Sequence, residues 1–347
     1  MSKFNIAVVG ATGNVGREIL NIIDSRNFPV KNLSAVASAK SEGQKIVYGN
    51  DKEVEVQSLE SFDFKNIDIV LSSPGSKISA KFVPIATKAG AFVIDNTSYF
   101  RMKKDVPLII PEVNPEALDE FFEDDNRSNI ISNPNCSTIQ MLVAIKPIYD
   151  ASIINRIIVS TYQSVSGAGK EAMDELFEQT KDIYANKNIQ KTKFSKQIAF
   201  NAIPHIGCFL ENGNTEEEEK MINETKKILD PNINVSATCV RVPIFISHAE
   251  SINLELDSPL SDDEAKQILS NINHISVIDH RKDEGYVTQV EAAGDDKVFI
   301  SRIRRDDTIE NGLNLWVVSD NLRKGAALNA IQIAELVTTK YSQNITN

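Results

Sequence analysis

Near its N-terminus the chain reads Gly10-Ala11-Thr12-Gly13-Asn14-Val15-Gly16, and this loop sets the architecture around it. The apolar run Ile6–Val9 predicts a buried strand before the loop, and Val15–Ser25 predicts a helix after it. Glycines here let the backbone turn tightly and approach a pyrophosphate, which the amides of a helix N-terminus attract. The alternative is a glycine-rich turn that serves only to pack the helix on a sheet. The strand before and the helix after favour a dinucleotide-binding loop.

The residues that follow continue the alternation of strand and helix. Strands are predicted over Leu33–Ala37, Ile67–Ser72 and Ala91–Asp95, and a helix over Ser79–Ala89. Buried strands separated by helices imply a parallel sheet with right-handed crossovers. We therefore predict an α/β fold that starts with a doubly wound Rossmann-type domain over residues 1–130, ending after the polar segment Glu123–Asn129.

The second half has a different pattern, because its strands partly alternate between apolar and polar residues. Strands are predicted over Arg156–Tyr162, Ala237–Ile246, Ser251–Leu256, Val298–Arg304 and Leu313–Ser319, with helices over Lys170–Lys187 and Thr215–Leu229 and after Ser261. Such alternation is typical of a sheet with one solvated or interface face. We predict an α+β catalytic and dimerisation domain over residues 131–320. The helix-like end of the chain, about 321–347, is expected to pack back on the first domain.

Composition excludes several classes of protein. A length of 347 residues suggests two domains, and 37 basic against 48 acidic residues give a net charge of −11, which disfavours nucleic-acid binding. The sequence has neither an apolar run of about 18 residues nor a signal-peptide pattern, so we expect a cytoplasmic protein that does not bind membranes. Three cysteines without a CxxC pair predict neither a disulfide framework nor a metal site.

The end of the second predicted strand bears on the choice of cofactor. NAD-binding sites usually present a carboxylate there for the ribose hydroxyls. This chain reads Ala37-Ser38-Ala39-Lys40-Ser41 instead, which favours a 2′-phosphate at Lys40 and Ser41 and therefore NADP. A merely solvated Lys40 is the alternative. Ser73, which follows the next strand, is expected to line the cofactor groove.

Cys136 is the candidate reactive thiol. It precedes the apolar helical run Ile139–Ile145, so it is expected at a helix N-terminus, where the dipole favours a thiolate. An ordinary helix start with a buried cysteine fits the pattern equally well. Cys208 and Cys239 lie in or beside apolar sequence and are expected in the core.

Further candidate residues lie in the second half. His248 follows a predicted strand among polar neighbours and could serve as the base that a thiolate nucleophile needs. Arg241 lies among apolar residues and needs an anionic partner, either a structural carboxylate or a substrate carboxylate. Thr215 and Glu218 form a capping-box pattern at the start of an acidic helix, and a solvated helix start is the default for it.

Taken together, eight ordered motifs resemble aspartate-semialdehyde dehydrogenase. They are Gly10–Gly16, Asp95–Met102, Ser132–Gln140, Ser160–Gly169, Asn201–Ile206, Glu217–Leu229, Ala237–Ser251 and Leu315–Ala327. The resemblance implies NADPH-dependent reduction of L-4-aspartyl phosphate to L-aspartate 4-semialdehyde and phosphate. That step leads to lysine, methionine, threonine, isoleucine and, in bacteria, diaminopimelate. Alternatives are a related acyl-phosphate reductase, such as N-acetyl-glutamyl-phosphate reductase, and a catalytically silent NADP-binding regulator.

The resemblance also implies a role for each matching residue. Cys136 would be the nucleophile, His248 the acid/base group, and Gln163 the residue that orients the acyl group. Arg241 and Glu217 would bind the substrate's α-carboxylate and α-ammonium groups. Arg101, Lys220 and Asn135 would bind phosphate. The expected cofactor contacts are Gly10, Thr12, Gly13, Asn14, Val15, Gly16, Lys40, Ser41, Ser73, Ser166, Gly167 and Asn321.

The chain departs from the family pattern at a few positions. Lys40 stands where many relatives have arginine, and Asn214 replaces an aromatic residue. Ser247-His248-Ala249 differs from a common Gly-His-Ser, and Glu123–Asn129 is longer than in some relatives. None of these changes removes a reacting group. The resemblance further implies a homodimer, possibly a tetramer.

Overall fold

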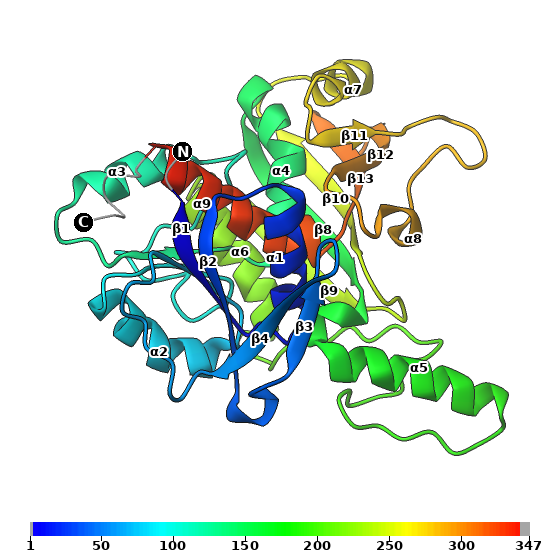
Figure 1. Cartoon of the computed structure of the whole chain (residues 1–347). Helices are drawn as coiled ribbons and strands as arrows, with labels where there is room; N and C mark the ends of the chain where they lie inside the picture. The colour runs from blue at the N-terminus through cyan, green and yellow to red at the C-terminus, as the bar shows by residue number, and fades with distance from the viewer. Residues whose placement is uncertain (1–2, 341–347) are drawn as a thin grey trace. The chain divides into compact units, whose positions relative to one another are not determined.

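The computed structural model describes residues 3–340, which form two compact units (Figure 1). Unit 1 contains residues 3–135 and 326–340 of this range, and unit 2 contains Cys136–Gly325. The sequence predicts domain boundaries at 130 and 321, whereas residues 131–135 lie in unit 1 and residues 321–325 in unit 2. Residues 341–347 of the expected C-terminal segment lie outside the described part. Within residues 3–340, no helix combines the length and the apolar character that a membrane crossing requires.

Unit 1 is built on a seven-stranded sheet in the order β3-β4-β2-β1-β5-β6-β7. The strands are β1 (Phe4–Val9), β2 (Val30–Ala37), β3 (Lys45–Tyr48), β4 (Lys52–Ser58), β5 (Ile69–Ser72), β6 (Phe92–Asp95) and β7 (Ile130–Ser132). Neighbouring strands are parallel except for the antiparallel pair β3–β4. The predicted doubly wound sheet is therefore confirmed. Strands β3 and β4 were not predicted, because their charged residues leave only a weak apolar signal.

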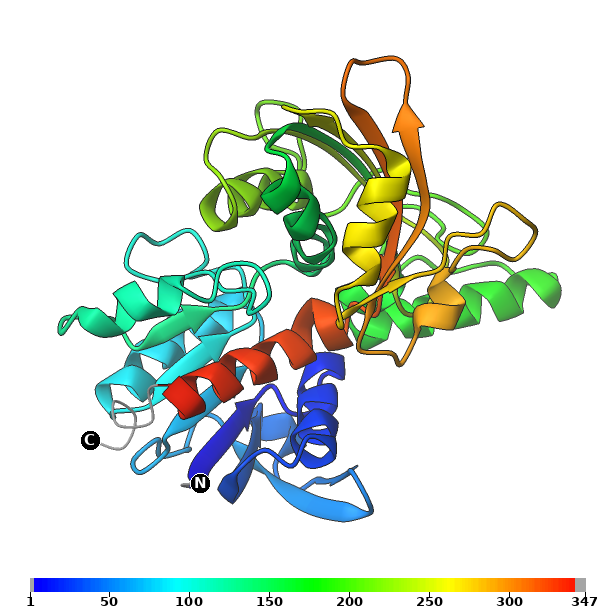
Figure 2. The ribbon, with the colours of Figure 1, turned by 90° about the horizontal axis from the view of Figure 1, so that it is seen from above.

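Helices cover both faces of this sheet. They are α1 (Asn14–Ser25), α2 (Ser76–Lys88), α3 (Ala117–Glu123) and α9 (Leu328–Lys340), with the 3₁₀ turn η1 (Ala39–Ser41) after β2. Side chains alternate along β1, so Ile6 and Val8 share one apolar cluster with α1, α3 and α9, whereas Ala7 and Val9 pack with α2 on the other face. Figure 2 shows α9 in red beside the blue α1. The last helix thus completes the core of unit 1.

Unit 2 contains a mixed six-stranded sheet in the order β11-β12-β13-β10-β8-β9. Its strands are β8 (Ile154–Gln163), β9 (Asn234–Arg241), β10 (His248–Leu256), β11 (Ile275–Val277), β12 (Val298–Asp306) and β13 (Gly312–Ser319). Its helical segments are α4 (Cys136–Ala151), η2 (Val165–Ala168), α5 (Lys170–Tyr184), α6 (Glu216–Ile228), α7 (Asp262–Ser270), α8 (Gln289–Ala292) and the π-helical η3 (Arg323–Ala327), whose last two residues lie in unit 1. The predicted α+β class is confirmed.

The two faces of this sheet differ in their burial. Helices α4, α6 and α7 pack on one face, where Val159 and Thr161 of β8 are buried. On the other face Ser160 and Tyr162 are half-buried, and Tyr162 packs beside Trp316. The alternation along β8 therefore separates a covered face, which carries the candidate reacting groups, from a face that remains partly open.

One predicted strand ends earlier than the sequence analysis expected. The apolar stretch Ala237–Ile246 predicted one strand, but β9 ends at Arg241, and His248 begins β10 instead of following a strand. Pro243 has no N–H to donate to a sheet, and Ser247 adopts a left-handed φ of 75° that turns the chain. Strand β9 therefore ends at Arg241 and strand β10 begins at His248, so both residues lie at the same edge of the sheet.

Candidate active site

The glycine loop of unit 1 follows β1 and allows close backbone approach. A Cβ on Gly10, whose φ is +84°, would lie 2.7 Å from the carbonyl carbon of Ser73, and a Cβ on Gly16 would lie 2.2 Å from the oxygen of Gly10. Both glycines are therefore required by packing, as the alternative interpretation held. The loop nevertheless also borders a cavity, so packing does not exclude a role in binding.

This cavity of about 540 Å³ lies at the carboxyl edge of the parallel strands, where β1 lies between β2 and β5. Of the expected cofactor residues, Gly10, Thr12, Gly13 and Ser73 line it. The N-cap of α1, Gly13, has no side-chain capping bond, and the first turn carries no acidic residue. A pyrophosphate would meet the positive end of the α1 dipole and no repulsive carboxylate from that turn, so the residues fit a dinucleotide.

The other expected cofactor residues of unit 1 do not line the cavity. Asn14 and Val15 begin α1 with Gly16 behind them, and Lys40 and Ser41 form η1 directly after β2, with the Lys40 side chain exposed. The sequence analysis missed Lys81, which does line the cavity from α2. Little in the sequence indicates this role: Lys81 lies in the second turn of α2, the helix that follows β5. Glu60 lines the same cavity.

Arg101 and Asn135, the expected phosphate-binding residues of unit 1, are buried polar groups. The Arg101 guanidinium is anchored by backbone carbonyls: Nε donates to the oxygen of Asn133 at 2.9 Å and Nη2 to that of Asn96 at 2.7 Å. These two contacts fix the direction of the cationic side chain.

Unit 2 begins with the candidate nucleophile, Cys136, as the first residue of α4. The thiol is half-buried, and the positive end of the helix dipole favours its ionised form. Of the other cysteines, Cys239 is buried as predicted, but the prediction for Cys208 was wrong. Cys208 is exposed because it belongs to the loop before α6, where its backbone N–H bonds the Glu216 carboxylate.

Three candidate residues from three strands form one row on the covered face of the sheet. Gln163, the last residue of β8, is directly paired with Arg241 on β9 and with His248 on β10. Directly paired residues on adjacent strands project from the same face. All three side chains are buried. The register of the sheet thus assembles groups that are up to 85 residues apart in the sequence, counting from Gln163 to His248 (248 − 163).

Arg241 is buried without a counter-ion. Its Nη1 donates to the carbonyl oxygen of Ser164 at 2.6 Å, and it forms no ion pair with any residue between 3 and 340. Burial lowers the pKa of its guanidinium, while the nearby Glu217 carboxylate acts in the opposite direction. Because a buried cation without a salt bridge is unfavourable, the absence of a structural carboxylate favours an anionic ligand as the partner.

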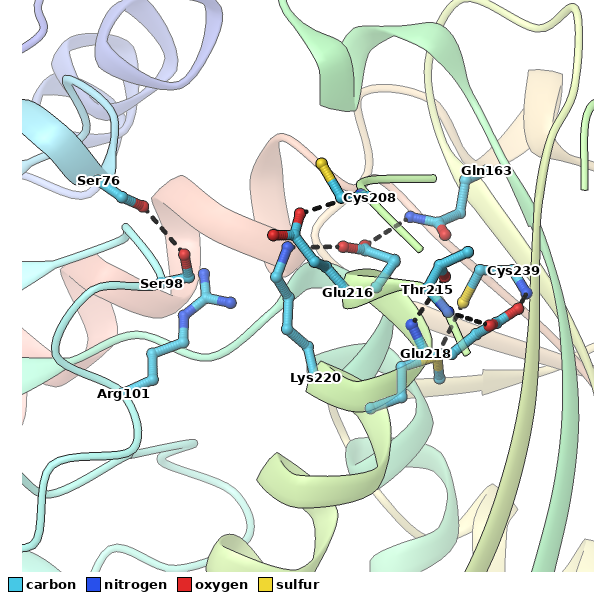
Figure 3. A network of polar contacts seen from close by, with 12 residues as sticks. Ser76, Ser98, Arg101, Gln163, Cys208, Thr215, Glu216, Glu218, Lys220 and Cys239 are labelled. Carbon is cyan, nitrogen blue, oxygen red and sulfur yellow. Dashed lines mark hydrogen bonds and ion pairs between the residues drawn. The ribbon is translucent and has the colours of Figure 1, made fainter. Parts of the chain in front are cut away.

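Glu217 joins two other expected site residues through its carboxylate. One oxygen accepts from Gln163 Nε2 at 3.0 Å, and the other from Lys220 Nζ at 3.0 Å. Figure 3 labels both donors, Gln163 and Lys220, and draws a dashed line from each side chain. The acidic run predicts a solvated helix start by default, but Glu217 is buried. The start of α6 therefore presents a positioned charge pair toward the row of strand residues.

A capping box fixes this end of α6. Thr215 Oγ1 accepts from the backbone N–H of Glu218, and the Glu218 carboxylate accepts from that of Thr215, as predicted. The other Glu218 oxygen accepts from the backbone N–H of Cys239 on β9 at 3.0 Å, so the cap also ties the helix to the sheet (Figure 3). This double anchor places Glu217, one residue earlier, against β8.

His248 is fully buried at the start of β10. Its Nδ1 lies 3.1 Å from the backbone nitrogen of Ser164 and 3.1 Å from that residue's hydroxyl. Burial and, to a smaller extent, the charge of Arg241 lower the pKa of the imidazole to about 3. His248 is therefore neutral near pH 7 in this arrangement.

The expected cofactor residues of unit 2 lie around the same histidine. Gly167 is close to it, because a Cβ there would be 3.4 Å from His248 Nε2 and 3.4 Å from Arg241 Nη1. Asn321 Oδ1 accepts from the hydroxyls of Ser164 and Ser166 at 3.1 and 3.2 Å and from the Ser247 backbone N–H at 2.9 Å. The Asn321 side chain thus links the segments on both sides of His248. Ser164 is a site residue that the sequence analysis missed, since a serine in a small-residue loop gives no distinctive signal.

Comparison with known proteins agrees with this geometry. Residues 5–121 match the family model described as semialdehyde dehydrogenase, NAD binding domain, and residues 145–324 match semialdehyde dehydrogenase, dimerisation domain. The chain is 50% identical to the aspartate-semialdehyde dehydrogenase of Aquifex aeolicus, over 96% of this chain and 98% of that one. It is also 50% identical to aspartate-semialdehyde dehydrogenase 2 of Vibrio cholerae, over 98% and 99%.

Solved structures give the same result. The crystal structure of aspartate-semialdehyde dehydrogenase II from Vibrio cholerae complexed with ASA superimposes with a TM-score of 0.94 at 50% identity, covering 98% of this chain and all of that chain. A probable aspartate-semialdehyde dehydrogenase from Pseudomonas aeruginosa superimposes with a TM-score of 0.92 at 28% identity, with the same coverage.

Proposed function

Because this chain belongs to the aspartate-semialdehyde dehydrogenase family, we propose that it reduces L-4-aspartyl phosphate to L-aspartate 4-semialdehyde and phosphate through a thioester on Cys136. It is an oxidoreductase with an NAD(P)-binding domain. The observation that carries the proposed chemistry is the row of Arg241, Gln163 and His248 in the unit that begins with the thiol. The similar proteins favour neither N-acetyl-glutamyl phosphate as the substrate nor a silent regulatory role.

In the proposed reaction the Cys136 sulfur attacks the acyl carbon, the bond to the phosphate oxygen breaks, and a thioester remains. The bound nicotinamide supplies the hydride that reduces this thioester. Gln163 orients the acyl group, since the bond from its amide to Glu217 holds the side chain in one direction. His248 would serve as the acid/base group that moves protons on the sulfur and on the hemiacetal oxygen. The thiohemiacetal then releases the aldehyde and frees the sulfur for another turnover.

Substrate recognition is proposed to rest on charge matching. Arg241 would take the α-carboxylate bidentately, which supplies the counter-ion that the guanidinium lacks. Glu217 would accept the α-ammonium group. Arg101, Asn135 and Lys220 are assigned to the phosphate from the family motifs. The buried Arg241 guanidinium would then gain a carboxylate partner when substrate binds.

For the cofactor we propose NADP, with Lys40 as the cation for the 2′-phosphate. Its place in η1, directly after β2, and the absence of a carboxylate from Ala37–Ser41 support this choice. Gly10–Gly16 and Ser73 would hold the dinucleotide, with Ser166, Gly167 and Asn321 contributing from unit 2. The cofactor domain would be unit 1, with residues 3–135 and 326–340, and the catalytic and dimerisation domain would be unit 2, Cys136–Gly325.

We further propose a cytoplasmic enzyme of lysine, methionine, threonine, isoleucine and diaminopimelate synthesis. The matched dimerisation domain supports a homodimer. Its contact would be the partly open face of the unit 2 sheet, with Tyr162 and Trp316 at its centre. A tetramer would require a second interface.

The direct test is the reverse reaction. The purified protein, given aspartate semialdehyde, NADP and phosphate, should form NADPH, and the reaction should depend on phosphate. Parallel assays with NAD measure the cofactor preference. The same assays with Cys136→Ala should show no turnover, and full activity of this variant would overturn the nucleophile assignment. N-acetyl-glutamate semialdehyde, used as the competing substrate, should react with a much lower kcat/KM.

A further inference from the structure

Arg101, the arginine assigned to the phosphate, is held by two backbone carbonyls from different segments of unit 1. Its Nε donates to the oxygen of Asn133 at 2.9 Å, and its Nη2 donates to the oxygen of Asn96 at 2.7 Å. Asn96 follows β6 and Asn133 follows β7, and these two strands are parallel neighbours in the sheet. The direction of the guanidinium therefore depends on the groups that fix these two peptide units.

Asp95, the last residue of β6, fixes the peptide unit of Asn96. Its buried Oδ1 accepts from the hydroxyls of Ser72 and Ser79, both at 2.8 Å, and from the Thr97 backbone N–H at 3.2 Å. The Thr97 hydroxyl donates to Oδ2 at 2.8 Å, and the Asn96 backbone N–H donates to the Ser72 oxygen at 2.9 Å. The chain is thus anchored on both sides of the Asn96 carbonyl.

Asn133 is anchored by β6 and by the C-terminal helix. Its backbone N–H donates to the carbonyl oxygen of Asp95 at 2.8 Å. Its Oδ1 accepts from Asn329 Nδ2 at 2.7 Å, and the same Nδ2 donates to the oxygen of Ile109 at 3.1 Å. Asn329 is fully buried and is the second residue of α9. The helix therefore reaches the peptide unit that holds Arg101.

An arginine binds phosphate well when its planar guanidinium already faces the anion. The fork of N–H groups matches the oxygens in one orientation, and affinity is lost when the side chain must first be ordered. Asn135, also assigned to the phosphate, follows Asn133 by two residues, so the same anchor restrains it. Arg241 and Glu217, assigned to the semialdehyde, belong to unit 2 and are held by other contacts. Loss of the Asn133 anchor should therefore affect phosphate selectively.

We propose that Asn329 and Asp95 are positioning residues for phosphate, because they hold the carbonyls that direct Arg101. Through Asn329, the C-terminal helix α9 takes part in phosphate binding as well as in the core of unit 1. The inference deepens the proposed function and rests on it, since Arg101 is the phosphate ligand in that function.

The first test removes the amide that reaches Asn133. Asn329→Leu keeps the size of the side chain but loses both N–H donors. The matched control is Gln332→Leu on the same helix, because Gln332 Nε2 donates to Glu112 Oε1 at 2.9 Å and not to Asn133. In the reverse reaction, Asn329→Leu should raise the KM for phosphate about tenfold and leave the KM for the semialdehyde within about twofold. Gln332→Leu should leave both KM values within about twofold.

A second pair of variants keeps the inference testable if Asn329→Leu does not fold. Thr97→Val removes the hydroxyl that donates to Asp95 and preserves the shape of a buried side chain. The next residue provides the control: the Ser98 hydroxyl is exposed and contacts Ser76 at 2.9 Å (Figure 3). Thr97→Val should raise the KM for phosphate by about three- to tenfold, and Ser98→Ala should leave it within about twofold.

A double-mutant cycle tests whether Asn329 acts through Arg101. Arg101→Leu alone should lower kcat/KM for phosphate by about 10²-fold, and this ratio can be measured without saturation. Adding Asn329→Leu to Arg101→Leu should lower it by no more than about a further twofold, since the side chain to be positioned is already absent. Fully additive losses would contradict a role through Arg101, because a general loss of structure would act in both backgrounds.

A titration with inorganic phosphate followed by ³¹P NMR reads the same contact without turnover. Asn329→Leu should bind phosphate about tenfold more weakly than the wild type, and Gln332→Leu should bind it equally well. Equal phosphate affinities of the two variants, or equal rises in the KM values for phosphate and semialdehyde in Asn329→Leu, would overturn the inference. Absence of semialdehyde activity in a wild type that binds phosphate would instead overturn the proposed function.

Discussion

Gly325 lies directly against Cys136, so that a Cβ on Gly325 would stand 2.9 Å from the Cβ of Cys136. This is closer than two carbon atoms can approach without a shift in the backbone of η3 or α4. The glycine therefore makes room for the nucleophile at the start of its helix.

We predict that Gly325→Ala displaces the thiol and lowers kcat by about 10²-fold, because a shift of about 1 Å is enough for such a loss. Overpacking should also lower the free energy of unfolding by about 1–3 kcal/mol. Steady-state kinetics and denaturant melts measure both effects. A variant with wild-type kcat would show that the thiol position tolerates the methyl group.

Gly167→Ala is the same chemical change in a different setting. The new methyl would lie 3.4 Å from Arg241 Nη1 and His248 Nε2, so it would enter the proposed substrate space without a severe clash. We expect kcat/KM for the semialdehyde to fall by about 10- to 100-fold, equal to about 1.4–2.7 kcal/mol, while the free energy of unfolding changes by less than about 0.5 kcal/mol. Unchanged kinetics would place the substrate elsewhere.

Arg241→Lys keeps a positive charge but loses the planar fork for a carboxylate. We expect kcat/KM to fall by about 10²-fold, mainly through a higher KM for the semialdehyde, and the KM for phosphate to change little. Arg156→Lys, on an exposed position of β8, is the matched control and should behave as wild type. A similar rise in both KM values would contradict a specific contact with the α-carboxylate.

Glu250 should make stability depend on pH. Its fully buried carboxyl has no hydrogen-bond partner within residues 3–340, although the nearby Gln140 amide weakly favours the ionised form. Burial raises the pKa of Glu250 well above 4.5, so the folded protein binds a proton that the unfolded chain releases. This group therefore contributes most stability below pH 4.5 and loses that contribution as the pH rises.

Glu250→Gln removes the titration while keeping the shape of the side chain. The variant should gain stability relative to wild type as the pH rises from 5 to 8, and the gain should vanish near pH 4. Urea melts across this range measure the difference. The control is Glu255→Gln, on the half-exposed face of the same strand, for which we expect a change within about 0.5 kcal/mol. A pH-independent effect of Glu250→Gln would contradict the raised pKa.

Lys40→Ala tests the proposed cofactor preference. The KM for NADP should rise by about tenfold, because one exposed charge contact to a phosphate is lost, and the KM for NAD should stay the same. Lys45→Ala, an exposed lysine on the neighbouring β3 that pairs with Glu53, controls for general charge. Equal effects on the KM values for NADP and NAD would show that Lys40 does not bind the 2′-phosphate. Lys81, which lines the cavity, would then be the candidate for this contact.

Local sequence was sufficient for the elements with a strong periodic signal. The apolar runs before and after Gly10–Gly16 predicted β1, α1 and the parallel sheet, because a buried strand and an amphipathic helix each leave their own period in the sequence. The capping box at Thr215 was equally local, since both of its bonds join residues three apart. The end of β9 was missed because an apolar run continues past Pro243, where a sheet cannot continue.

The identity of each reacting group was also present in the sequence, through the ordered motifs around Cys136, Gln163, Arg241 and His248. Their arrangement was not. Only the register of three strands shows that Arg241, Gln163 and His248 form one row, because pairing partners on adjacent strands are set by long-range hydrogen bonds that leave no local pattern.

The tertiary structure alone also decided which charges are paired. It shows that Arg241 is buried and forms no ion pair within residues 3–340, that Glu217 is buried, and that the backbone N–H of Ser164 contacts the His248 imidazole. The physical reason is that burial and hydrogen-bond direction depend on neighbours distant in sequence. The chain by itself determined which chemical groups are available, and packing determined the protonation and the direction in which they can act.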